Sequence, residues 1–251
     1  MRIVPVPNQS DNYAYLIIDE IAKRAASVDP YDVDKVTSTA TAEGVEISAN
    51  ISTHHHNDHT GGNSQLQSLY PNIPFYAGSN KASATSHIVK HGDNFKFGNL
   101  DISCFGTPCH TQDSIAFFVE DKATRQKAVF TGDTLFTAGC GRFFEGTPEE
   151  MHKSLNGVLA KLPSETVVYN GHEYTAGNVK FALKIEPENQ ALKDLADYTH
   201  TNKRTVGVYT IADELKHNPF MRLHEKAVQD ATGESAPIEV MARLREMKNK
   251  G

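Results

Sequence analysis

Four side chains of the kinds that bind metal ions lie within six residues of one another. They are His54, His56, Asp58 and His59, in the run Thr53-His54-His55-His56-Asn57-Asp58-His59. Imidazole and carboxylate groups suit zinc, iron and manganese alike. In a loop, alternate residues can turn toward one point, so His54 and His56 can share one ion while Asp58 and His59 lie near a second. A single surface histidine is usually just a solvated side chain, but a cluster this dense predicts a metal site.

Three further candidate ligands follow later predicted strands. They are His110, Asp133 and His172. Side chains at successive strand ends converge on one edge of a sheet, where α/β proteins usually build their sites. His55 is flanked by two predicted ligands and should point away, supporting the loop. The remaining histidines are interpreted as solvated side chains: His87, His91, His152, His200, His217 and His224.

Two neighbours of these candidates allow more than one interpretation. Cys109 precedes His110 and could be a soft metal ligand or a nucleophile, or simply a small packed residue. Asp29 precedes Pro30 and could orient a metal-bound imidazole, or could cap a turn. The sequence leaves both questions open.

Short apolar runs alternate with helical stretches over the first two-thirds of the chain, which indicates an α/β fold. Strands are predicted over residues 12–18, 25–28, 45–51, 74–77, 100–105, 115–119, 128–130 and 166–169, and helices over 32–43, 61–69 and 147–162. The strand over 45–51 leads directly into the histidine cluster. Thr147 can cap the last of these helices, and Pro148 suits its first turn.

The pattern becomes helical after Gly171. A helix is predicted over 178–200 with a break near Pro187, and a basic helix from residue 238. We therefore expect an α/β domain over residues 1–175 and a smaller all-helical domain over residues 176–251.

The bulk composition of the 251 residues limits the possible partners. The formal net charge of -6 argues against a broad surface for nucleic acid or anionic membrane. No apolar stretch approaches the ~20 residues that a membrane-spanning helix needs, and no signal peptide is visible. Three cysteines without CxxC spacing make a disulfide framework unexpected. We expect a cytoplasmic monomer.

The seven candidate ligands follow the signature of the metallo-β-lactamase superfamily, HxHxDH followed by a distant His, Asp and His. All seven positions match, and the order of elements agrees over roughly residues 1–175. The resemblance implies an αββα sandwich, in which two sheets are packed between helices.

A more specific similarity is to the glyoxalase II, or hydroxyacylglutathione hydrolase, family. It covers the whole chain and depends on three runs: Gly132 to Gly146, which contains Gly-Cys-Gly-Arg-Phe-Phe-Glu-Gly, then Gly171-His172-Glu173-Tyr174-Thr175, and Asn218-Pro219-Phe220-Met221-Arg222. The resemblance implies hydrolysis of S-(2-hydroxyacyl)glutathione thioesters, chiefly S-D-lactoylglutathione to glutathione and D-lactate, the second step of methylglyoxal detoxification. Only this resemblance implies the roles of the two expected domains, catalytic for residues 1–175 and substrate-binding for residues 176–251.

The same resemblance implies a centre of two divalent ions, zinc first, with iron or manganese also suitable. It assigns one ion to His54, His56 and His110, the other to Asp58, His59 and His172, and makes Asp133 the bridge. A hydroxide shared by the ions attacks the thioester, with Asp58 and Asp133 as catalytic carboxylates. The implied glutathione-binding residues are Arg142, Phe144, Tyr174, Arg245 and Lys248. Without the resemblance, Arg245 and Lys248 would be interpreted as a solvated basic tail.

Two positions depart from the family pattern. Phe144 stands where many relatives have Tyr, so a hydroxyl contact to the ligand is missing. Gln112-Asp113-Ser114 stands where many have Gly-His. Neither change affects a predicted ligand.

Alternative functions remain within and outside the superfamily. Persulfide dioxygenases use a related glutathione substrate but hold one metal ion. β-lactamases and lactonases need an active site that is open to bulky rings and lacks a basic pocket. Nucleases carry more positive charge than this chain, and redox di-iron modules have Glu at the position of His56. A non-catalytic protein that binds metal or glutathione is the alternative outside enzymes.

Overall fold

The computed structural model describes residues 1–251, which divide into two compact units. The first, here called the sheet unit, comprises residues 1–106 and 113–132. The second, the helical unit, comprises residues 107–112 and 133–251. The division into domains at residues 175 and 176, expected from the sequence, remains a prediction.

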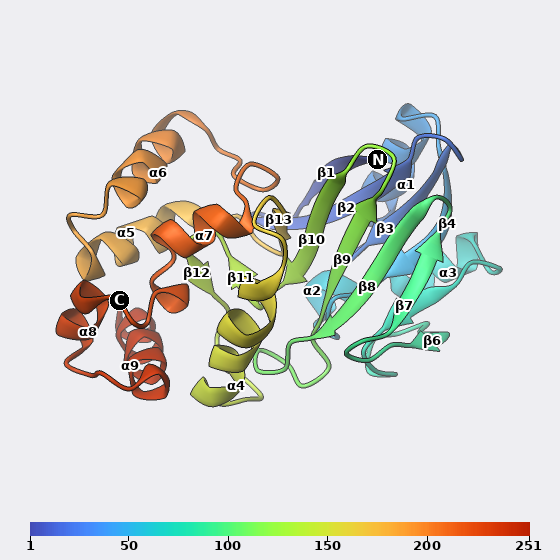
Figure 1. The fold of residues 1–251 in the computed structure, drawn as a ribbon. Helices are drawn as coiled ribbons and strands as arrows, with labels where there is room; N and C mark the ends of the chain where they lie inside the picture. The colour runs from blue at the N-terminus through green and yellow to red at the C-terminus, as the bar shows by residue number, and fades with distance from the viewer. The chain divides into compact units, whose positions relative to one another are not determined.

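The first sheet of the sheet unit has six strands in the order β1 to β6 (Figure 1). These are β1 (Arg2–Asn8), β2 (Asn12–Asp19), β3 (Arg24–Val28), β4 (Glu46–Ile51), β5 (Phe75–Ala77) and β6 (His87–Ile88). Every residue of β2 is buried, as its apolar run predicts for a central strand. β1 carries Pro5 and Pro7 and lies at the edge, where a missing N–H donor is tolerated.

Four strands of a second sheet also belong to this unit, in the order β10, β9, β8 and β7. They are β7 (Asn94–Phe97), β8 (Leu100–Gly106), β9 (Ile115–Asp121) and β10 (Gln126–Gly132), and all three pairings are antiparallel. The rings of Tyr15 on β2 and Phe130 on β10 meet edge to face, with centroids 5.4 Å apart. The two sheets therefore pack face to face in this unit.

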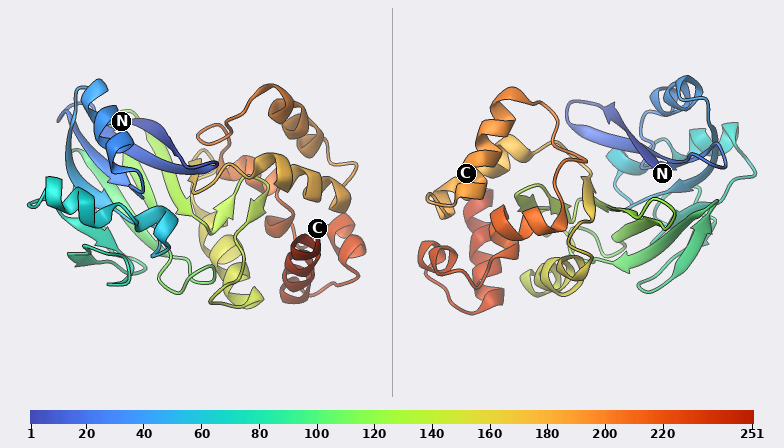
Figure 2. Two further views of the ribbon diagram at one scale, coloured as in Figure 1. Left: turned by 180° about the vertical axis from the view of Figure 1, so that it is seen from behind. Right: turned by 45° about the horizontal axis from the view of Figure 1, so that its top comes forward.

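Helices cover the outer face of the first sheet. α1 (Val33–Ala42) places Val33, Val36 and Ala40 in a cluster with buried side chains of β1 to β5, and Figure 2 shows this helix in front of the strands in the view from behind. α2 (Asn57–Thr60) and α3 (Asn63–Leu69) follow β4. This packing fixes the end of β4, from which the histidine cluster continues.

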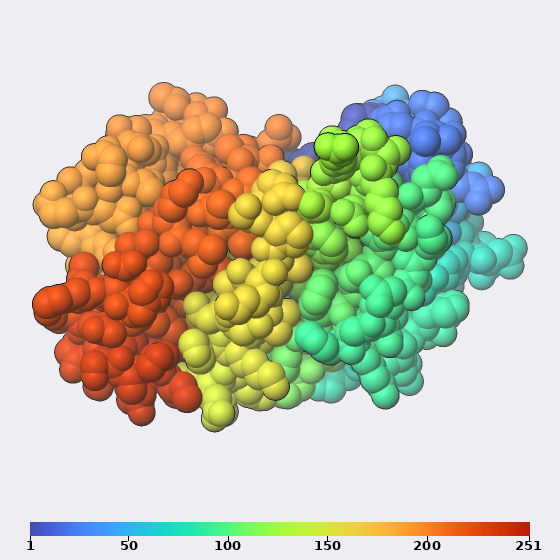
Figure 3. All heavy atoms as spheres, in the orientation of Figure 1, coloured from blue at the N-terminus to red at the C-terminus, as the bar shows by residue number.

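The helical unit begins its regular structure with a short hairpin, β11 (Leu135–Phe136) and β12 (Gly139–Cys140). Its other elements are α4 (Pro148–His152), a π turn over Lys153–Val158, a 3-10 turn over Leu159–Lys161, β13 (Val167–Asn170), α5 (Thr175–Ile185), α6 (Gln190–Thr201), α7 (Ile211–His217), the 3-10 turn Pro219–Met221, α8 (Lys226–Thr232) and α9 (Pro237–Lys250). Ala138 packs against Val179 and Ala182 of α5, with Leu192 and Leu195 of α6. The outward side chains of α6 and α7, orange in Figure 3, form part of the surface of this unit.

Most of the predicted elements are confirmed, with ends shifted by a few residues. All eight predicted strands are present, and the helix over 178–200 is interrupted near Pro187 as α5 and α6. Thr147 caps α4 in a capping box with Glu150. No helix of the structure has the length and apolar character needed to cross a membrane.

The differences have local causes. The helix predicted over 61–69 is wrong at its start: α2 begins at Asn57 and is separated from α3 at Gly61 and Gly62. A Cβ on Gly62 would lie 1.9 Å from the carbonyl oxygen of Pro30, so this close approach requires glycine. The helix predicted over 147–162 is α-helical only over α4. The sequence did not predict β1, β6, β7, β11, β12, α7 or α8, most of which are too short to show a period.

Candidate metal centre

The end of β4 delivers His54, His56, Asp58 and His59 into one short loop. His56 occupies the N-cap position of α2, and its carbonyl oxygen accepts hydrogen bonds from the backbone of His59 and Thr60 at 3.0 and 2.9 Å. His54 and His59 are each only 1% exposed. The chain therefore passes from strand to helix within the cluster. As a result, the side chains of the cluster point toward one another and do not alternate between two faces as they would in a strand.

The imidazoles of this loop lie close enough to share cations. His54 Nε2 and His56 Nδ1 are 3.2 Å apart, and the rings of His54 and His59 have centroids 4.2 Å apart. Asp58 Oδ2 lies 3.7 Å from His59 Nε2 and accepts a hydrogen bond from Asn12 Nδ2 at 3.0 Å. The sheet unit thus brings together all four ligands predicted in the HxHxDH run.

Asp29 fixes the orientation of the His59 ring through its Nδ1 atom. One carboxylate oxygen lies 3.0 Å from His59 Nδ1 and 2.6 Å from Thr53 Oγ1, and the other accepts from Thr53 N at 2.8 Å. Asp29, His54 and His59 offer donor atoms within 4.8 Å of one another, and all three are buried. With Nδ1 of His59 committed to Asp29, Nε2 is the nitrogen left to face a metal ion. The two interpretations of Asp29 are thereby resolved in favour of the imidazole contact.

The helical unit holds the other three candidates around Asp133. The Oδ2 atom of Asp133 lies 3.4 Å from His110 Nε2 and 3.3 Å from His172 Nε2. All three residues are at most 8% exposed. A Cβ on Gly141 would lie 1.9 Å from the backbone carbonyl oxygen of Asp133 and 3.0 Å from His110 Nδ1, so glycine is needed where the chain passes these two residues. The prediction that these three residues converge is met within this unit.

These donors fit a divalent cation. His110 Nδ1 donates to the carbonyl oxygen of Arg142 at 3.0 Å, so its Nε2 presents a lone pair toward the carboxylate of Asp133. A lone pair and an anionic oxygen repel one another unless a cation or a proton lies between them. The His and Asp groups of this chain therefore form a cluster that suits a divalent metal ion.

Cys109 is a packed residue. It is fully buried, burial raises the pKa of its thiol to about 12, and its Sγ donates to the carbonyl oxygen of Thr147 at 3.3 Å. A nucleophilic thiol needs a lowered pKa and access to substrate. The interpretation of Cys109 as a nucleophile is therefore disfavoured.

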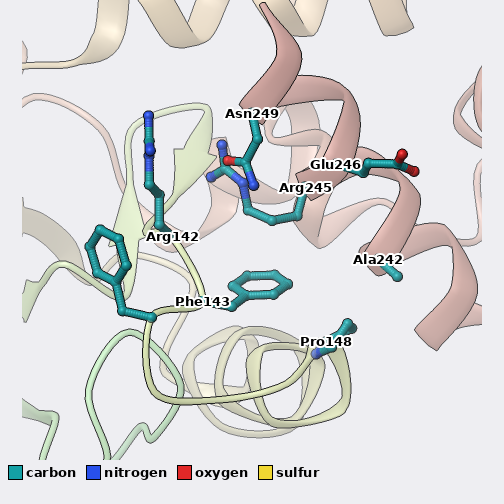
Figure 4. A pocket seen from close by; sticks show the side chains of 8 residues that line it. Arg142, Phe143, Pro148, Ala242, Arg245, Glu246 and Asn249 are labelled. Atoms are coloured by element: carbon teal, nitrogen blue, oxygen red, sulfur yellow. The ribbon is translucent and has the colours of Figure 1, made fainter.

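All five predicted glutathione-binding residues belong to the helical unit. Arg142, Phe144 and Arg245 line a cavity of about 370 Å³. Figure 4 shows Arg245 and Asn249 projecting from α9 toward the loop that carries Arg142 and Phe143. The full lining is Arg142, Phe143, Phe144, Pro148, Ala242, Arg245, Glu246 and Asn249.

Tyr174 and Phe144 are partly exposed aromatic groups beside predicted ligands. The ring of Tyr174 stacks on His172, with centroids 4.6 Å apart and an interplanar angle of 8°. The ring of Phe144 lies 5.2 Å from that of His110 and is 62% exposed. Each presents an apolar ring next to a predicted metal ligand, where substrate would arrive.

Arg245 and Lys248 are not a solvated tail. Arg245 is 6% exposed and donates to the carbonyl oxygen of Cys140 at 3.1 Å. Lys248 lies over the ring of Phe181, 5.1 Å from its centroid. Burial, together with the charge of the neighbouring Arg245, lowers the pKa of Lys248 to about 8. A buried and a half-buried cation close together favour the binding of an anion.

One histidine prediction is wrong. His217 was expected to be solvated but is 2% exposed, and its Nε2 lies 3.1 Å from Glu214 Oε1. Glu214 and Asn218 are fully buried, and both hold the β11–β12 hairpin: Glu214 accepts from Ala138 N at 3.0 Å, and Asn218 donates to Gly139 O at 3.0 Å. In the sequence, this network was marked only by the run Asn218-Pro219-Phe220-Met221-Arg222, which carries the family resemblance. The run itself does not indicate which residues Glu214, His217 and Asn218 contact.

Two family models together cover residues 41–251. Residues 41–172 match the metallo-beta-lactamase superfamily, and residues 173–251 match the model described as hydroxyacylglutathione hydrolase C-terminus. A Schizosaccharomyces pombe protein named probable hydroxyacylglutathione hydrolase is 43% identical, over 100% of this chain and 99% of its own length. This chain belongs to the hydroxyacylglutathione hydrolase family. An Arabidopsis thaliana relative, named hydroxyacylglutathione hydrolase cytoplasmic, is 42% identical over 100% of this chain and 99% of its own length.

Solved structures agree with the assignment of this family member to the superfamily. ETHE1 from Myxococcus xanthus has a TM-score of 0.72 and 28% identity, covering 97% of this chain and 90% of that one. The BLEG-1 B3 metallo-beta-lactamase has a TM-score of 0.66 and 21% identity, covering 88% of this chain and 100% of that one. The predicted fold class is confirmed: a metallo-β-lactamase fold followed by a helical C-terminal part. As a hydroxyacylglutathione hydrolase family member, the chain is a hydrolase.

Proposed function

We propose that this chain hydrolyses S-(2-hydroxyacyl)glutathione thioesters, chiefly S-D-lactoylglutathione, to glutathione and a 2-hydroxy acid. Relatives that carry the hydroxyacylglutathione hydrolase name match the chain from end to end. The observation that carries the proposal is the pair of neighbouring cations, Arg245 (buried) and Lys248 (half-buried), in the same unit as the Asp133 carboxylate and its two histidines. A thioester of an anionic tripeptide is the substrate that such a combination suits.

The proposed centre holds two divalent ions, with zinc the first expectation and iron or manganese also suitable. One ion would be held by His54, His56 and His110, the other by Asp58, His59 and His172, with Asp133 between them. When bound, such ions lower the pKa of water toward ~7 and polarise a carbonyl group. What supports this arrangement is the donor chemistry within each unit: Asp29 fixes the donor nitrogen of His59, and the Arg142 carbonyl fixes that of His110.

The chain's own residues would bind and orient the substrate. Arg142, Arg245 and Lys248 offer cations to the carboxylates of glutathione, and arginine can bind a carboxylate through two parallel hydrogen bonds. Tyr174 offers a phenol, and Phe144 an apolar ring, to the peptide backbone. The carboxylates of glutathione are remote from its thioester bond, so Arg142, Arg245 and Lys248 would set affinity and orientation more than the rate of bond cleavage.

Asp58 and Asp133 are the proposed catalytic carboxylates. Their carboxylate oxygens would accept hydrogen bonds from the attacking water and orient it toward the thioester carbonyl. The leaving group is a thiolate with a pKa near ~8.5, so it can leave without a proton donor. Because water is the proposed nucleophile, no Ser-His-Asp arrangement is required, and Cys109, buried with a raised thiol pKa, is not expected to take part.

A substrate panel tests the proposal. Purified chain is assayed with S-D-lactoylglutathione, a β-lactam and a lactone, and oxygen uptake is followed with glutathione persulfide. We expect hydrolysis of the thioester alone, at a rate that Asp133→Ala removes. Oxygen uptake with one iron per chain, or faster turnover of the lactam, would refute it. We further propose that the protein is cytoplasmic, binds no nucleic acid and is a monomer. The mass of the protein in solution checks the oligomeric state.

A further inference from the structure

A buried carboxylate outside the predicted ligand set contacts the metal-binding loop. His55 Nδ1 donates to Asp113 Oδ1 at 2.7 Å, and Ser79 Oγ donates to Asp113 Oδ2 at 2.7 Å. Asp113 is 8% exposed, and all three residues belong to the sheet unit. One carboxylate therefore ties the loop after β5 to the imidazole that stands between His54 and His56.

The backbone around this carboxylate is clamped as well. Ile115 N donates to the carbonyl oxygen of Thr53 at 2.8 Å, directly before the histidine cluster. On the other side, a Cβ on Gly78 would lie 2.0 Å from the carbonyl oxygen of Asp113, so the two segments touch through their main chains. Residues 113–115 are thus held between residues 78–79 and 53–55. This leaves the Asp113 side chain little freedom to move away from His55.

The loop needs such a support. Residues 52–56 lie between β4 and α2 and belong to no strand or helix, so no regular ladder fixes the backbone of His54 and His56. Metal ligands must be held within about 0.5 Å of their working positions by the contacts of their neighbours. Fixing the His55 ring fixes the backbone on both sides of it, and with it the directions of the two flanking imidazoles.

We propose that Asp113 is a positioning residue that sets the metal affinity of the 53–59 loop through His55. This inference rests on the proposed function only in taking His54 and His56 as metal ligands. It also gives a role to the departure from the family pattern at Gln112-Asp113-Ser114, because a glycine at position 113 would bring no carboxylate to His55. The expected consequence is a metal site that depends on a side chain 57 residues away from His56 in the sequence.

The test measures zinc binding to the full-length, metal-free chain by competition with a chromophoric chelator. Asp113→Ala should weaken the affinity about 10-fold, the lower end of the range seen when a direct partner of a metal ligand is removed, because Asp113 acts on the ligands through His55. His55→Phe should cause a similar loss, and the double variant should be no worse than either single one, because both break the same contact. Asp113→Asn keeps one acceptor oxygen and should recover part of the affinity.

Asp19→Ala is the matched control. Asp19 is also a buried carboxylate of the sheet unit, 2% exposed, and accepts hydrogen bonds from the backbone of Ile21, Ala22 and Asn99. Its loss should lower the Tm of the metal-free chain while leaving zinc affinity within about 2-fold of wild type. A merely structural role for Asp113 would give the same result as this control.

Three outcomes would overturn the inference: zinc affinity of Asp113→Ala equal to that of Asp19→Ala, losses from Asp113→Ala and His55→Phe that multiply in the double variant, or no recovery in Asp113→Asn. Assaying the wild type with lactoylglutathione separates the two proposals. If the wild type binds zinc but leaves this thioester intact, the proposed substrate fails, while the zinc affinities still decide the role of Asp113.

Discussion

Lys248 Nζ donates a 2.6 Å hydrogen bond to Asn178 Oδ1, which joins the last helix of the chain to α5. Asn178 in turn donates to the carbonyl oxygen of Thr137 at 3.0 Å, in the turn between β11 and β12. One helical turn before Lys248, Arg245 donates to the carbonyl oxygen of Cys140 on the same hairpin. Arg245 is therefore held by the β11–β12 hairpin directly and Lys248 through Asn178, and the loop that carries Arg142 continues from the hairpin.

This arrangement predicts a pH-dependent KM. Burial lowers the pKa of Lys248 to about 8, so its cation is present below that pH and is lost as the pH rises through it. We expect the KM for S-D-lactoylglutathione to rise several-fold above about pH 8, with a smaller change in kcat. Initial rates measured across this range check the prediction.

Lys248→Arg provides the control, because arginine keeps its charge throughout this range. Its KM should stay flat where that of the wild type rises, and an identical rise in both proteins would exclude Lys248 as the cause. Whereas substrate binding weakens as the pH rises, the stability that this lysine contributes to the fold is expected to increase. The unfolded chain keeps the lysine proton up to about pH 10.5, so it binds more protons than the folded chain above about pH 8. The contribution of Lys248 to the free energy of unfolding therefore increases with pH between these values.

The nucleophile can be identified from two substitutions. Cys109→Ala should keep most of the turnover, because the thiol is buried with a pKa of about 12. Asp133→Ala should lower kcat at least about 100-fold, because both His110 and His172 lose the carboxylate they face. Steady-state rates with metal content measured on each sample decide the matter. A large loss in Cys109→Ala with full activity in Asp133→Ala would reverse the assignment.

Phe144 offers a gain of affinity. Its ring is 62% exposed and lines the cavity with Arg142 and Arg245, so a hydroxyl added at its tip has room and a ligand within reach. A new hydrogen bond contributes about 0.5–1.5 kcal/mol, so Phe144→Tyr should lower KM about 2-fold to 10-fold with little change in kcat. Phe144→Leu, which adds no hydroxyl, is the control. Equal KM values for the Tyr variant and the wild type would show that substrate does not contact this ring.

Glu214 should be the most sensitive residue of the hairpin support. It is fully buried and accepts from Ala138 N and from Asn218 Nδ2 at 3.0 and 2.9 Å. Glu214→Ala removes the buried acceptor of Ala138 N and the buried partner of His217 Nε2, at a cost of about 1–3 kcal/mol each, while Asn218 keeps its hydrogen bond to Gly139 O. Urea unfolding should show a loss of about 3 kcal/mol or more, and Glu214→Gln should lose less. A loss below about 1 kcal/mol in the alanine variant would mean that the hairpin does not depend on this contact.

The sequence indicated the proposed metal ligands more readily than the residues that hold them in place. His54, His56, Asp58 and His59 were recognisable because they are adjacent, and the structure brings them together within one unit. Asp29 remained ambiguous because its carboxylate could equally cap a turn before Pro30. Only coordinates show that its oxygen lies 3.0 Å from His59 Nδ1.

The missed features share a physical cause, which is that they depend on contacts between distant segments. β11 and β12 have two residues each, too few for alternation, and are held by Glu214 and Asn218 from about 80 residues away. His217 looked like a solvated histidine because its neighbours are polar, yet its partner Glu214 lies buried one helical turn before it. Asp113 was seen only as a departure from a pattern.

The most direct test of the central claim is a metal titration of the metal-free chain. Zinc is added in steps, and hydrolysis of S-D-lactoylglutathione is measured together with the number of ions bound. If the seven predicted ligands form one centre, activity should reach its plateau at two ions per chain, and His54→Ala and His172→Ala should each bind fewer. Full activity at one ion per chain, or activity that does not depend on added metal, would contradict it.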